Sequence, residues 1–315
     1  MADEFGSRFA APIFERVAII GVGLIGSSLA RVIRRVNAAG KISLADYSSD
    51  VLKRAETLGL GDTYHLSAAL AVNGADAVIF CVPVGVNGEI AREIGGHLEP
   101  GVIVSDVGSV KVAVIDAIGP HLPREAHFVP AHPVAGTEQS GPDAGFAALF
   151  ANRWCILTPP EGTCVEAVAK ISRLWGSFGA NVEIMTASHH DLVLAITSHV
   201  PHLIAYNIVG TAADLEEVTR TEVIKYSAGG FRDFTRIAAS DPTMWRDVFL
   251  YNREAVLEML GRFSEDLTAL QRMIRRGDGD GLFNLFTRTR AIRTGIVSLG
   301  QETTAPDFGR RAGGR

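Results

Sequence analysis

Histidines and an arginine near the ends of predicted strands and helices are the residues of this chain that point most directly to chemistry. His132 follows a strand-like run at 127–131, and His202 lies one helical turn after His199. Arg236 comes later in the chain. A neutral imidazole can take the proton of a hydroxyl group while a cofactor accepts hydride from the same carbon. An arginine beside it would hold a carboxylate through two parallel hydrogen bonds. These residues predict a site that oxidises an alcohol carrying a carboxylate.

The candidate residues belong to four segments, which place reactive side chains at loop or helix ends facing the expected nicotinamide. The segments are 107–111, 131–138, 197–202 and 229–247. Taken alone, each segment has a plainer interpretation, as core histidines or as an ion network at a helix junction. His189 and His190 precede Asp191 at a predicted helix start, so we expect them to cap or pack the helix.

A cofactor for this chemistry is predicted by residues 16–46, around which the rest of the chain is organised. A strand-like run at 17–20 leads into GVGLIG at 21–26, then into an apolar-faced helix, then into a second strand at 41–45. This order of strand, glycine turn, helix and strand is the dinucleotide-binding βαβ fingerprint. A glycine-rich turn alone is weak evidence, and the elements on both sides make the fingerprint specific.

Each glycine of the fingerprint has a physical role. Gly21 would make the tight turn, Gly23 would let the backbone approach a pyrophosphate, and Gly26 would let the helix pack against the sheet. The anion would lie on the free N–H groups at the helix N-terminus. Asp46 stands 20 residues after Gly26; it would bind the ribose hydroxyls and repel a 2′-phosphate, which predicts NAD rather than NADP. The predicted cofactor-binding residues are Gly21, Gly23, Leu24, Ile25, Gly26, Asp46, Val82 and Pro83.

Strand-like and helical runs alternate along the first part of the chain. Apolar runs at 75–83 and 102–106 are typical of strands buried on both faces of a parallel sheet. Three further strand-like runs follow, at 127–131, 154–158 and 181–185. The expected fold class is α/β: an N-terminal Rossmann doubly wound sheet, followed by an all-helical C-terminal dimerisation domain.

From about residue 186 onward only helical periodicity remains. Helices are predicted at 187–213, 215–225, 244–275 and 281–300. The expected divisions are a flexible arm (1–13), an NAD-binding Rossmann domain (14–185), a helical substrate and dimerisation domain (186–300) and a disordered tail (301–315). Because long apolar-faced helices usually need a partner surface, we expect a homodimer rather than a compact monomer.

Composition excludes several classes of protein. The apolar content of 47% and charged content of 21% are those of a soluble globular protein. A net charge of −5 argues against a nucleic-acid binder. We expect no apolar run long enough to span a membrane and therefore no membrane association. Three separated cysteines predict neither a disulfide framework nor a metal site. The acidic N-terminus lacks a signal-peptide layout, so a cytoplasmic protein is expected.

Taken together, the four segments make the sequence similar to the TyrA family of tyrosine biosynthesis, the prephenate, arogenate and cyclohexadienyl dehydrogenases. The resemblance runs from residue 16 to about residue 299. It is carried by the motifs GVGLIGSSLA, DVGSVK, HPVAGTE, SHVPH and GGFRDFTRIAASDPTMWRDVF. It implies an oxidative decarboxylation in which hydride passes from the ring carbon bearing the C4 hydroxyl to NAD. Carbon dioxide leaves from C1 and the ring becomes aromatic.

The resemblance also implies roles for individual residues. His132 resembles the catalytic histidine that bonds the C4 hydroxyl, and Ser109 resembles the serine that orients this hydroxyl and the imidazole. Arg236 resembles the arginine that binds a substrate carboxylate, with Glu138 and Asp233 holding it in place. His202 resembles the histidine that contacts the substrate side chain, and Ser240 and Trp245 resemble pocket-closing positions, reached within the chain or from the partner subunit. The predicted substrate-binding residues are Arg236, His202, Thr137, Gly229, Ser240 and Trp245.

Some questions stay open at the level of the sequence. No residue decides between prephenate and arogenate, so a cyclohexadienyl dehydrogenase that accepts both is expected. The chain leaves no room for a chorismate mutase module before residue 16 or an ACT module after residue 300, so tyrosine is expected to inhibit competitively, if it inhibits. The alternative enzyme is a β-hydroxyacid dehydrogenase, which would need a lysine that residues 187–213 lack. A third alternative is a protein that binds NAD without turnover.

Overall fold

The computed structural model describes residues 11–137, 139–214, 225 and 229–298. The chain divides into two compact units, Met1–Val256 and Leu257–Arg315. Helix α12 (Arg253–Arg276) begins in the first unit and runs on into the second, where α13 (Gly279–Ser298) follows it. Most of the expected flexible arm, nearly all of the helix predicted at 215–225, and the expected tail at 301–315 lie outside the described residues.

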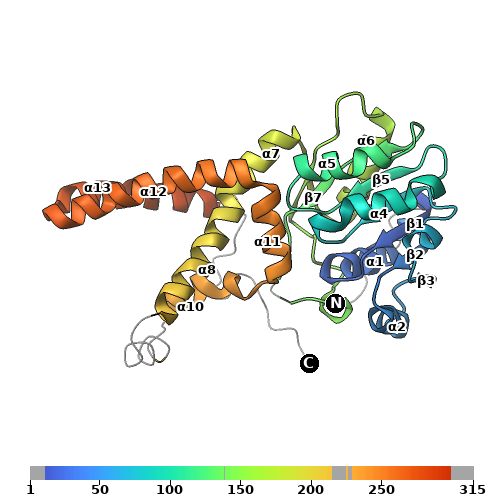
Figure 1. The fold of residues 1–315 in the computed structure, drawn as a ribbon, viewed down its shortest axis with the longest axis horizontal. Coiled ribbons are helices and arrows are strands. Elements are labelled where there is room, and N and C mark those ends of the chain that lie inside the picture. Colours follow the sequence, from blue (N-terminus) through green and yellow to red (C-terminus); the bar gives the residue numbers. More distant parts are fainter. Residues whose placement is uncertain (1–10, 138, 215–224, 226–228, 299–315) are drawn as a thin grey trace. The chain divides into compact units, whose positions relative to one another are not determined.

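Six parallel strands form the main sheet of the first unit, in the order β3-β2-β1-β4-β5-β6 (Figure 1). They are β1 (Phe14–Ile20), β2 (Ala39–Ala45), β3 (Thr63–His65), β4 (Ala77–Phe80), β5 (Ile103–Asp106) and β6 (His127–Phe128). The strand order reverses between β1 and β4, and in such sheets ligands bind beyond the carboxyl ends of the strands at that point. The predicted α/β fold with a doubly wound parallel sheet is confirmed.

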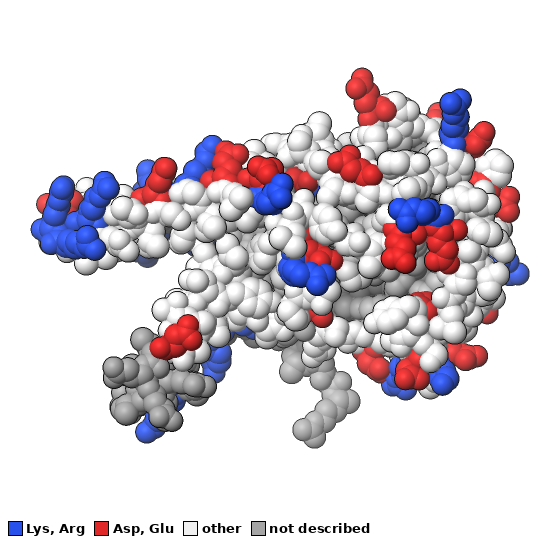
Figure 2. Space-filling view, viewed as in Figure 1, with Lys and Arg blue, Asp and Glu red and all other residues white. Residues whose placement is uncertain are grey.

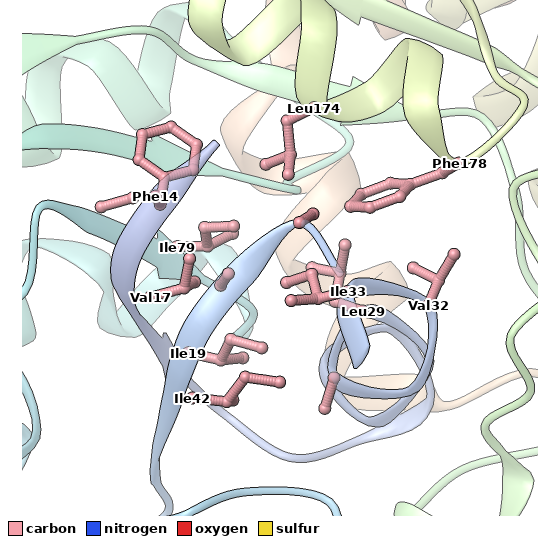
Figure 3. Close-up of a cluster of buried hydrophobic side chains, with 14 of the residues drawn as sticks. Phe14, Val17, Ile19, Leu29, Val32, Ile33, Ile42, Ile79, Leu174 and Phe178 are labelled. Carbon is pink, nitrogen blue, oxygen red and sulfur yellow. The ribbon is translucent and has the colours of Figure 1, made fainter. Parts of the chain in front are cut away.

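Helices cover both faces of this sheet, because its central strands are apolar on both sides. Val17 and Ile19 of β1 pack into one core with α1 and α6, whereas Ala18 and Ile20 pack into a second core with α3, α4 and α5. Figure 3 shows Leu29 and Ile33 of α1 directed at the strands of the first core, whereas Val32 is directed toward Phe178. These helices are α1 (Leu24–Val36), α2 (Ser49–Thr57), α3 (Ala68–Ala71), α4 (Asn87–Ile94), α5 (Val112–Ile118) and α6 (Val165–Ser177).

The run predicted as one strand at 127–131 is divided between two sheets. β6 ends at Phe128, and β7 (Ala131–Pro133) belongs to a separate three-stranded sheet with β8 (Trp154–Leu157) and β9 (Asn181–Ile184). β7 pairs antiparallel with β8, which pairs parallel with β9. Pro130 lies between β6 and β7, and a proline cannot donate to a strand ladder. His132 therefore lies on a strand that has left the main sheet.

The rest of the first unit is helical. The predicted helix at 187–213 is interrupted by a π-helical turn, Ala195–His199. The predicted helix at 244–275 is divided at Asn252, which separates α11 from α12. The helices of this part are α7 (Ala187–Leu194), α8 (Val200–Ala213), α10 (Gly229–Thr235) and α11 (Pro242–Tyr251).

The stretch Ala187–Ala213 corrects one expectation from the sequence. By length and composition it is apolar enough to cross a membrane, and among the described residues it is the one helix of which this is true. Core helices of globular proteins share this length and composition, and this stretch carries His190, Asp191 and His199, all buried inside the first unit.

Figure 2 shows how charged side chains are distributed on one face of the molecule. On the face in Figure 2, acidic and basic residues of the α/β part lie interspersed and form no continuous basic area. This distribution agrees with the formal net charge of −5. It offers no basic stripe on that face for a nucleic-acid backbone.

Candidate active site

The glycine turn between β1 and α1 has little room for side chains on its inner side. Gly21 has φ +95°, and a Cβ there would overlap the carbonyl group of Cys81. A Cβ on Gly26 would overlap the carbonyl oxygen of Gly21. Val82 Cγ1 would lie 2.9 Å from a Cβ on Gly21, so the predicted Val82–Pro83 loop after β4 borders the turn. Both glycines are therefore required by the close approach of α1 and β4 to this turn.

Gly23 differs from these two, because no atom lies within 4 Å of the position of its missing Cβ. Helix α1 begins next to it, at Leu24 and Ile25, with no capping side chain and no acidic residue in its first turn. The first N–H groups of a helix have no partners within the helix, and they attract anions. The open backbone at Gly23 and the uncapped start of α1 fit the pyrophosphate of a dinucleotide.

Asp46 is held beside this turn by the backbone. Its Oδ2 accepts a hydrogen bond from the Val22 N–H at 2.9 Å, and its Oδ1 accepts one from the Ser48 N–H at 3.0 Å. Each carboxylate oxygen keeps a further lone pair for another donor. The position fits a carboxylate that accepts hydrogen bonds from ribose hydroxyls and repels an added phosphate.

The loop after β4 is also joined to α11. Asp247 Oδ2 accepts a hydrogen bond from the Gly85 N–H at 3.1 Å, and Asp247 Oδ1 pairs with Arg246 at 2.7 Å. Trp245 precedes this pair on α11. The contact therefore connects the predicted nicotinamide side of the sheet to the helix that carries Trp245.

His132 lies at the centre of a buried polar cluster. Its Nδ1 is 2.8 Å from Nε2 of His190, and Nδ1 of His190 is 2.8 Å from Oδ1 of Asp191. All three residues are buried. Burial lowers the pKa of His132 well below its usual value, and the nearby His190, Lys111 and His199 lower it further. The imidazole of His132 is therefore neutral at pH 7 and able to accept a proton.

A fully buried ion pair supports the backbone on which His132 lies. Lys111 Nζ is 2.5 Å from Asp106 Oδ2 and donates a second hydrogen bond to the Ala131 carbonyl at 2.7 Å. Asp106 Oδ1 accepts from the Ala131 N–H at 3.2 Å. Both polar groups of the residue before His132 are thus bound by one ion pair. Burial lowers the pKa of Lys111, and Asp106 opposes that effect.

Asn252 and His199 extend the cluster. Asn252 Nδ2 donates to the Asp191 carbonyl at 2.8 Å and lies 3.0 Å from Nδ1 of His199. Burial lowers the pKa of His199 to about 4, against the opposing effect of Asp191. The Ser109 backbone also acts on the His199 ring, which places the predicted Ser109 segment beside this histidine.

The remaining predicted aromatic and basic residues meet around Trp245. The His202 ring stacks on Trp245 with centroids 3.6 Å apart, and His199 meets the same indole edge-on at 6.1 Å. Burial lowers the pKa of His202, and Arg236 lowers it further. Tyr206 donates to the Ser240 carbonyl at 2.8 Å. Trp245 thus contacts His202 within one chain, without a partner subunit.

The structure leaves some predicted contacts unsupported. No hydrogen bond joins the Ser109 side chain to His132 in the described part of the chain. Asp233 forms an exposed ion pair with Arg232 at 3.7 Å. Thr137 Oγ1 accepts a hydrogen bond from the Gln139 N–H at 3.2 Å, and Gly229 begins α10. Glu138 lies outside the described residues. Within the described ranges, no group of three or more His, Cys, Asp or Glu residues is placed to hold a metal ion.

Sequence reasoning missed the partners of His132. The interpretation of His190 as a capping or packing residue overlooked its contact with His132, and Asp191 and Asn252 received no role. The sequence did contain a signal for the ion pair that supports the backbone next to His132, because Asp106 and Lys111 flank Ser109 within a single short motif. Two opposite charges that close together, directly after a buried strand, point to a buried ion pair.

Comparison with known proteins shows where the chain belongs. Residues 29–184 match the model of the prephenate dehydrogenase nucleotide-binding domain, and residues 186–288 match the model of the prephenate dehydrogenase dimerization domain. A cyclohexadienyl dehydrogenase from Zymomonas mobilis is 44% identical over 90% of this chain and 97% of its own length. The chain belongs to the prephenate dehydrogenase (TyrA) family. It is a dehydrogenase, and the β-hydroxyacid alternative is not favoured.

Two solved structures of the family resemble this dehydrogenase. Prephenate dehydrogenase from A. aeolicus, crystallised with hydroxyphenyl propionate and NAD⁺, has a TM-score of 0.83 and 34% identity, over 90% of this chain and 98% of that chain. Arogenate dehydrogenase from Synechocystis has a TM-score of 0.75 and 26% identity, over 89% of this chain and 99% of that chain. The predicted Rossmann sheet followed by a helical region is the architecture of this family.

Proposed function

We propose that this chain is a cyclohexadienyl dehydrogenase that oxidises and decarboxylates prephenate, arogenate or both with NAD. The observation that carries the proposal is the buried, neutral His132 in a cluster that reaches His202 and Arg236 through His199 and Trp245. The family relationship supplies the substrate class. The glycine turn and the carboxylate of Asp46 fit the cofactor.

The residues of the chain divide the work of the reaction. His132 accepts the proton of the C4 hydroxyl, and its low pKa keeps it ready for that proton at pH 7. Ser109 orients the hydroxyl, and Arg236 holds a substrate carboxylate. When bound at the glycine turn, NAD supplies the two-electron acceptor. The carboxylate on C1 leaves as carbon dioxide, so Arg236 must not bind it. Arg236 therefore binds the side-chain carboxylate.

Some predicted roles rest on the family resemblance alone. Thr137, Gly229, Ser240 and His202 would contact substrate, and Trp245 would close the pocket. Glu138 and Asp233 would hold Arg236 in position. These assignments are part of the proposal.

The test is to measure reduction of NAD by the purified protein, with prephenate and arogenate supplied in separate reactions. The same reactions are then repeated with NADP in place of NAD. Turnover of both substrates with NAD supports the dual enzyme. Turnover of only one substrate would restrict the enzyme to that substrate and would still support the proposed mechanism. No turnover of either substrate with either cofactor would overturn the proposal.

We also propose that two copies of the chain form a homodimer. Only 28% of the apolar window in Ala187–Ala213 is buried. Large apolar side chains are exposed on α12 and α13; those more than half exposed are Leu257, Ile274, Phe283, Phe286 and Ile292. Apolar surface of this extent usually meets a partner. The dimerization-domain match, at residues 186–288, covers Ala187–Ala213, α12 and the first part of α13. One chain has a mass of 33.6 kDa, and light scattering after size exclusion should give twice that mass. The mass of a single chain at micromolar concentration would contradict the proposal.

Two smaller proposals complete the function. The enzyme works in the cytoplasm, where small soluble biosynthetic substrates are available. Tyrosine, if it inhibits, competes with substrate at the active site, because it is the product formed from arogenate and shares its phenol ring with the product formed from prephenate. Initial rates at several tyrosine concentrations would then meet at one maximal velocity. A lowered maximal velocity at saturating substrate would contradict competition.

A further inference from the structure

A chain of two hydrogen bonds links His132 to a carboxylate that does not touch it. His190 lies between His132 and Asp191, 2.8 Å from each along its two ring nitrogens. His190 is fully buried and Asp191 nearly so. The two come from α7, whereas His132 comes from β7. Nothing in the packing of a helix against a sheet requires this alignment of three polar groups.

The direction of these hydrogen bonds follows from the other partners of Asp191. Asp191 Oδ1 accepts the Lys111 N–H at 2.7 Å, and Oδ2 accepts the Val112 N–H at 3.0 Å. A carboxylate that takes backbone N–H groups on both oxygens acts as an acceptor, so Nδ1 of His190 must donate. A neutral histidine has one donor and one acceptor nitrogen, so Nε2 of His190 accepts. His132 must then donate from Nδ1.

This leaves Nε2 of His132 as the nitrogen with the free lone pair. In the described part of the chain, no hydrogen bond occupies it. We propose that His190, held by Asp191, is a positioning residue that fixes His132 in its Nδ1–H tautomer, so that Nε2 is the base that receives the hydroxyl proton. The inference rests on the proposed role of His132 and names the atom and the residues that prepare it.

The charges around the pair favour this arrangement. Lys111 faces His132 from the loop after β5, and Asp106, at the end of β5, binds the backbone of the preceding Ala131. His199 faces His132 from the π-helical turn, and Cys155 lies on the neighbouring strand β8. Burial raises the pKa of Cys155 well above its usual value, so this thiol is neutral. Burial also lowers the pKa of His190. Both imidazoles are therefore neutral before the reaction, and Asp191 stabilises the positive charge that forms when Nε2 takes the proton.

The same logic operates in the Ser-His-Asp triad, where a buried aspartate sets the tautomer of the base. Here His190 lies between the base and the carboxylate, so Asp191 orients His132 through His190 and not by direct contact. A purely structural His190 would instead fill space and would be replaceable by an aromatic ring of similar size. If His190 positions His132, activity requires a hydrogen-bond acceptor at the place of His190 Nε2. If His190 only fills space, activity does not require it.

Two substitutions separate these roles. His190→Phe keeps the aromatic bulk and removes the acceptor, so the His132 Nδ1 proton loses its partner. His190→Gln returns an acceptor oxygen close to the position of Nε2. We expect His190→Phe to lower kcat by about 10²-fold with KM within about twofold, and His190→Gln to recover at least about tenfold of that loss. His189→Phe, at an exposed neighbouring histidine, should match the parent enzyme.

The pH profile gives a second readout. In the parent enzyme and His190→Gln, kcat should be flat from about pH 6.5 upward, because the pKa of His132 lies below that range. In His190→Phe, His132 loses the effect of His190 that lowers its pKa, so the rise of kcat with pH should extend to a higher pH than in the parent enzyme. Equal loss of kcat in the Phe and Gln variants, with unchanged pH profiles, would overturn the positioning role.

A measurement without substrate keeps the inference testable if the Phe variant does not fold or the enzyme does not turn over. Long-range ¹H–¹⁵N spectra of histidine-labelled protein distinguish Nδ1–H from Nε2–H tautomers, and the His132 signals are assigned by their absence in His132→Asn. We expect Nδ1–H for His132 at pH 7. An Nε2–H tautomer would overturn the inference, whereas lack of turnover with an Nδ1–H tautomer would count against the proposed function alone.

Discussion

Residues 21–26 and the polar cluster around His132 are the two regions proposed to hold the cofactor and the base, and they are built differently. The glycine turn is a single run of six residues, held by close backbone contacts at Gly21 and Gly26 and by the apolar cores on both faces of the sheet. The polar cluster draws Asp106, Lys111, His132, His190 and Asn252 from four places in the chain. It is held by hydrogen bonds between buried groups.

The difference sets how each region tolerates change. An apolar core loses stability in proportion to the volume removed, and its neighbours partly relax. A buried polar cluster fails when one partner is lost, because the remaining group keeps its full cost of burial. Substitutions in the cluster should therefore have large effects that depend on the partner left behind.

The largest effect is expected for the base itself. His132→Asn should lower kcat by ~10²- to 10⁴-fold, the range for a lost general base, with KM little changed. Steady-state kinetics with prephenate and NAD measure both constants. His189→Asn serves as the control at an exposed histidine. Intact turnover with a large rise in KM would show that His132 binds substrate and does not act as the base.

Breaking the buried ion pair should cost the fold more than any exposed pair. Lys111→Met leaves the carboxylate of Asp106 buried without its cation, which should lower the free energy of unfolding by ~3–5 kcal/mol. Lys53→Met, which breaks an exposed pair with Asp50, should change it by less than about 1 kcal/mol. Urea unfolding compares the two. Similar small losses would show that the buried pair contributes no more than the exposed one.

Removing the predicted carboxylate ligand should act on binding. Arg236→Gln should weaken substrate binding by ~2–5 kcal/mol, seen as a raised KM, the range for one partner of a buried charge pair. Arg232→Gln, at a largely exposed arginine of the same segment, is the matched control. An unchanged KM in Arg236→Gln would move the carboxylate contact to another residue.

Acid should destabilise the cluster in a defined pH range. The pKa of His199 is about 4 in the folded chain, below the ordinary value of 6.5, so the unfolded chain binds the proton more readily between these values. Its contribution is complete above pH 6.5 and is lost as the pH falls toward 4, by about 3 kcal/mol. Urea midpoints across this range should fall less steeply in His199→Asn than in the parent. Parallel curves would contradict the assignment.

The smallest effect is expected beside the glycine turn, at Asp46. Asp46→Asn removes the charge that we predict faces the ribose, and it should reduce the preference for NAD over NADP by about tenfold, the size of one charge-assisted hydrogen bond. The ratio of kcat/KM for the two cofactors measures it, with Asp50→Asn as the control on α2. An unchanged ratio would show that cofactor choice is made elsewhere.

The same contrast explains what the sequence could predict. The fingerprint at 21–26, the alternating sheet and its helices were predictable, because glycine geometry and apolar periodicity act over short distances. The division of 127–131 between two sheets was missed, since a single proline decides it. The His190 and Asp191 contacts were missed because their meaning depends on β7, which is more than 50 residues away in the chain. Short-range patterns do not specify such encounters between distant polar groups.

The π-helical turn at Ala195–His199 decides which residues share a face of the first long helix. In a regular α-helix each residue turns the chain by about 100°, so His190 and His199 would lie on opposite sides. A π-helical turn absorbs roughly one extra residue, which brings both within about 80° of each other. His202 then falls within about 20° of His190. Removing one residue from this turn would send the histidines of the two segments in different directions, so the length of the chain here is as decisive as the identity of its side chains.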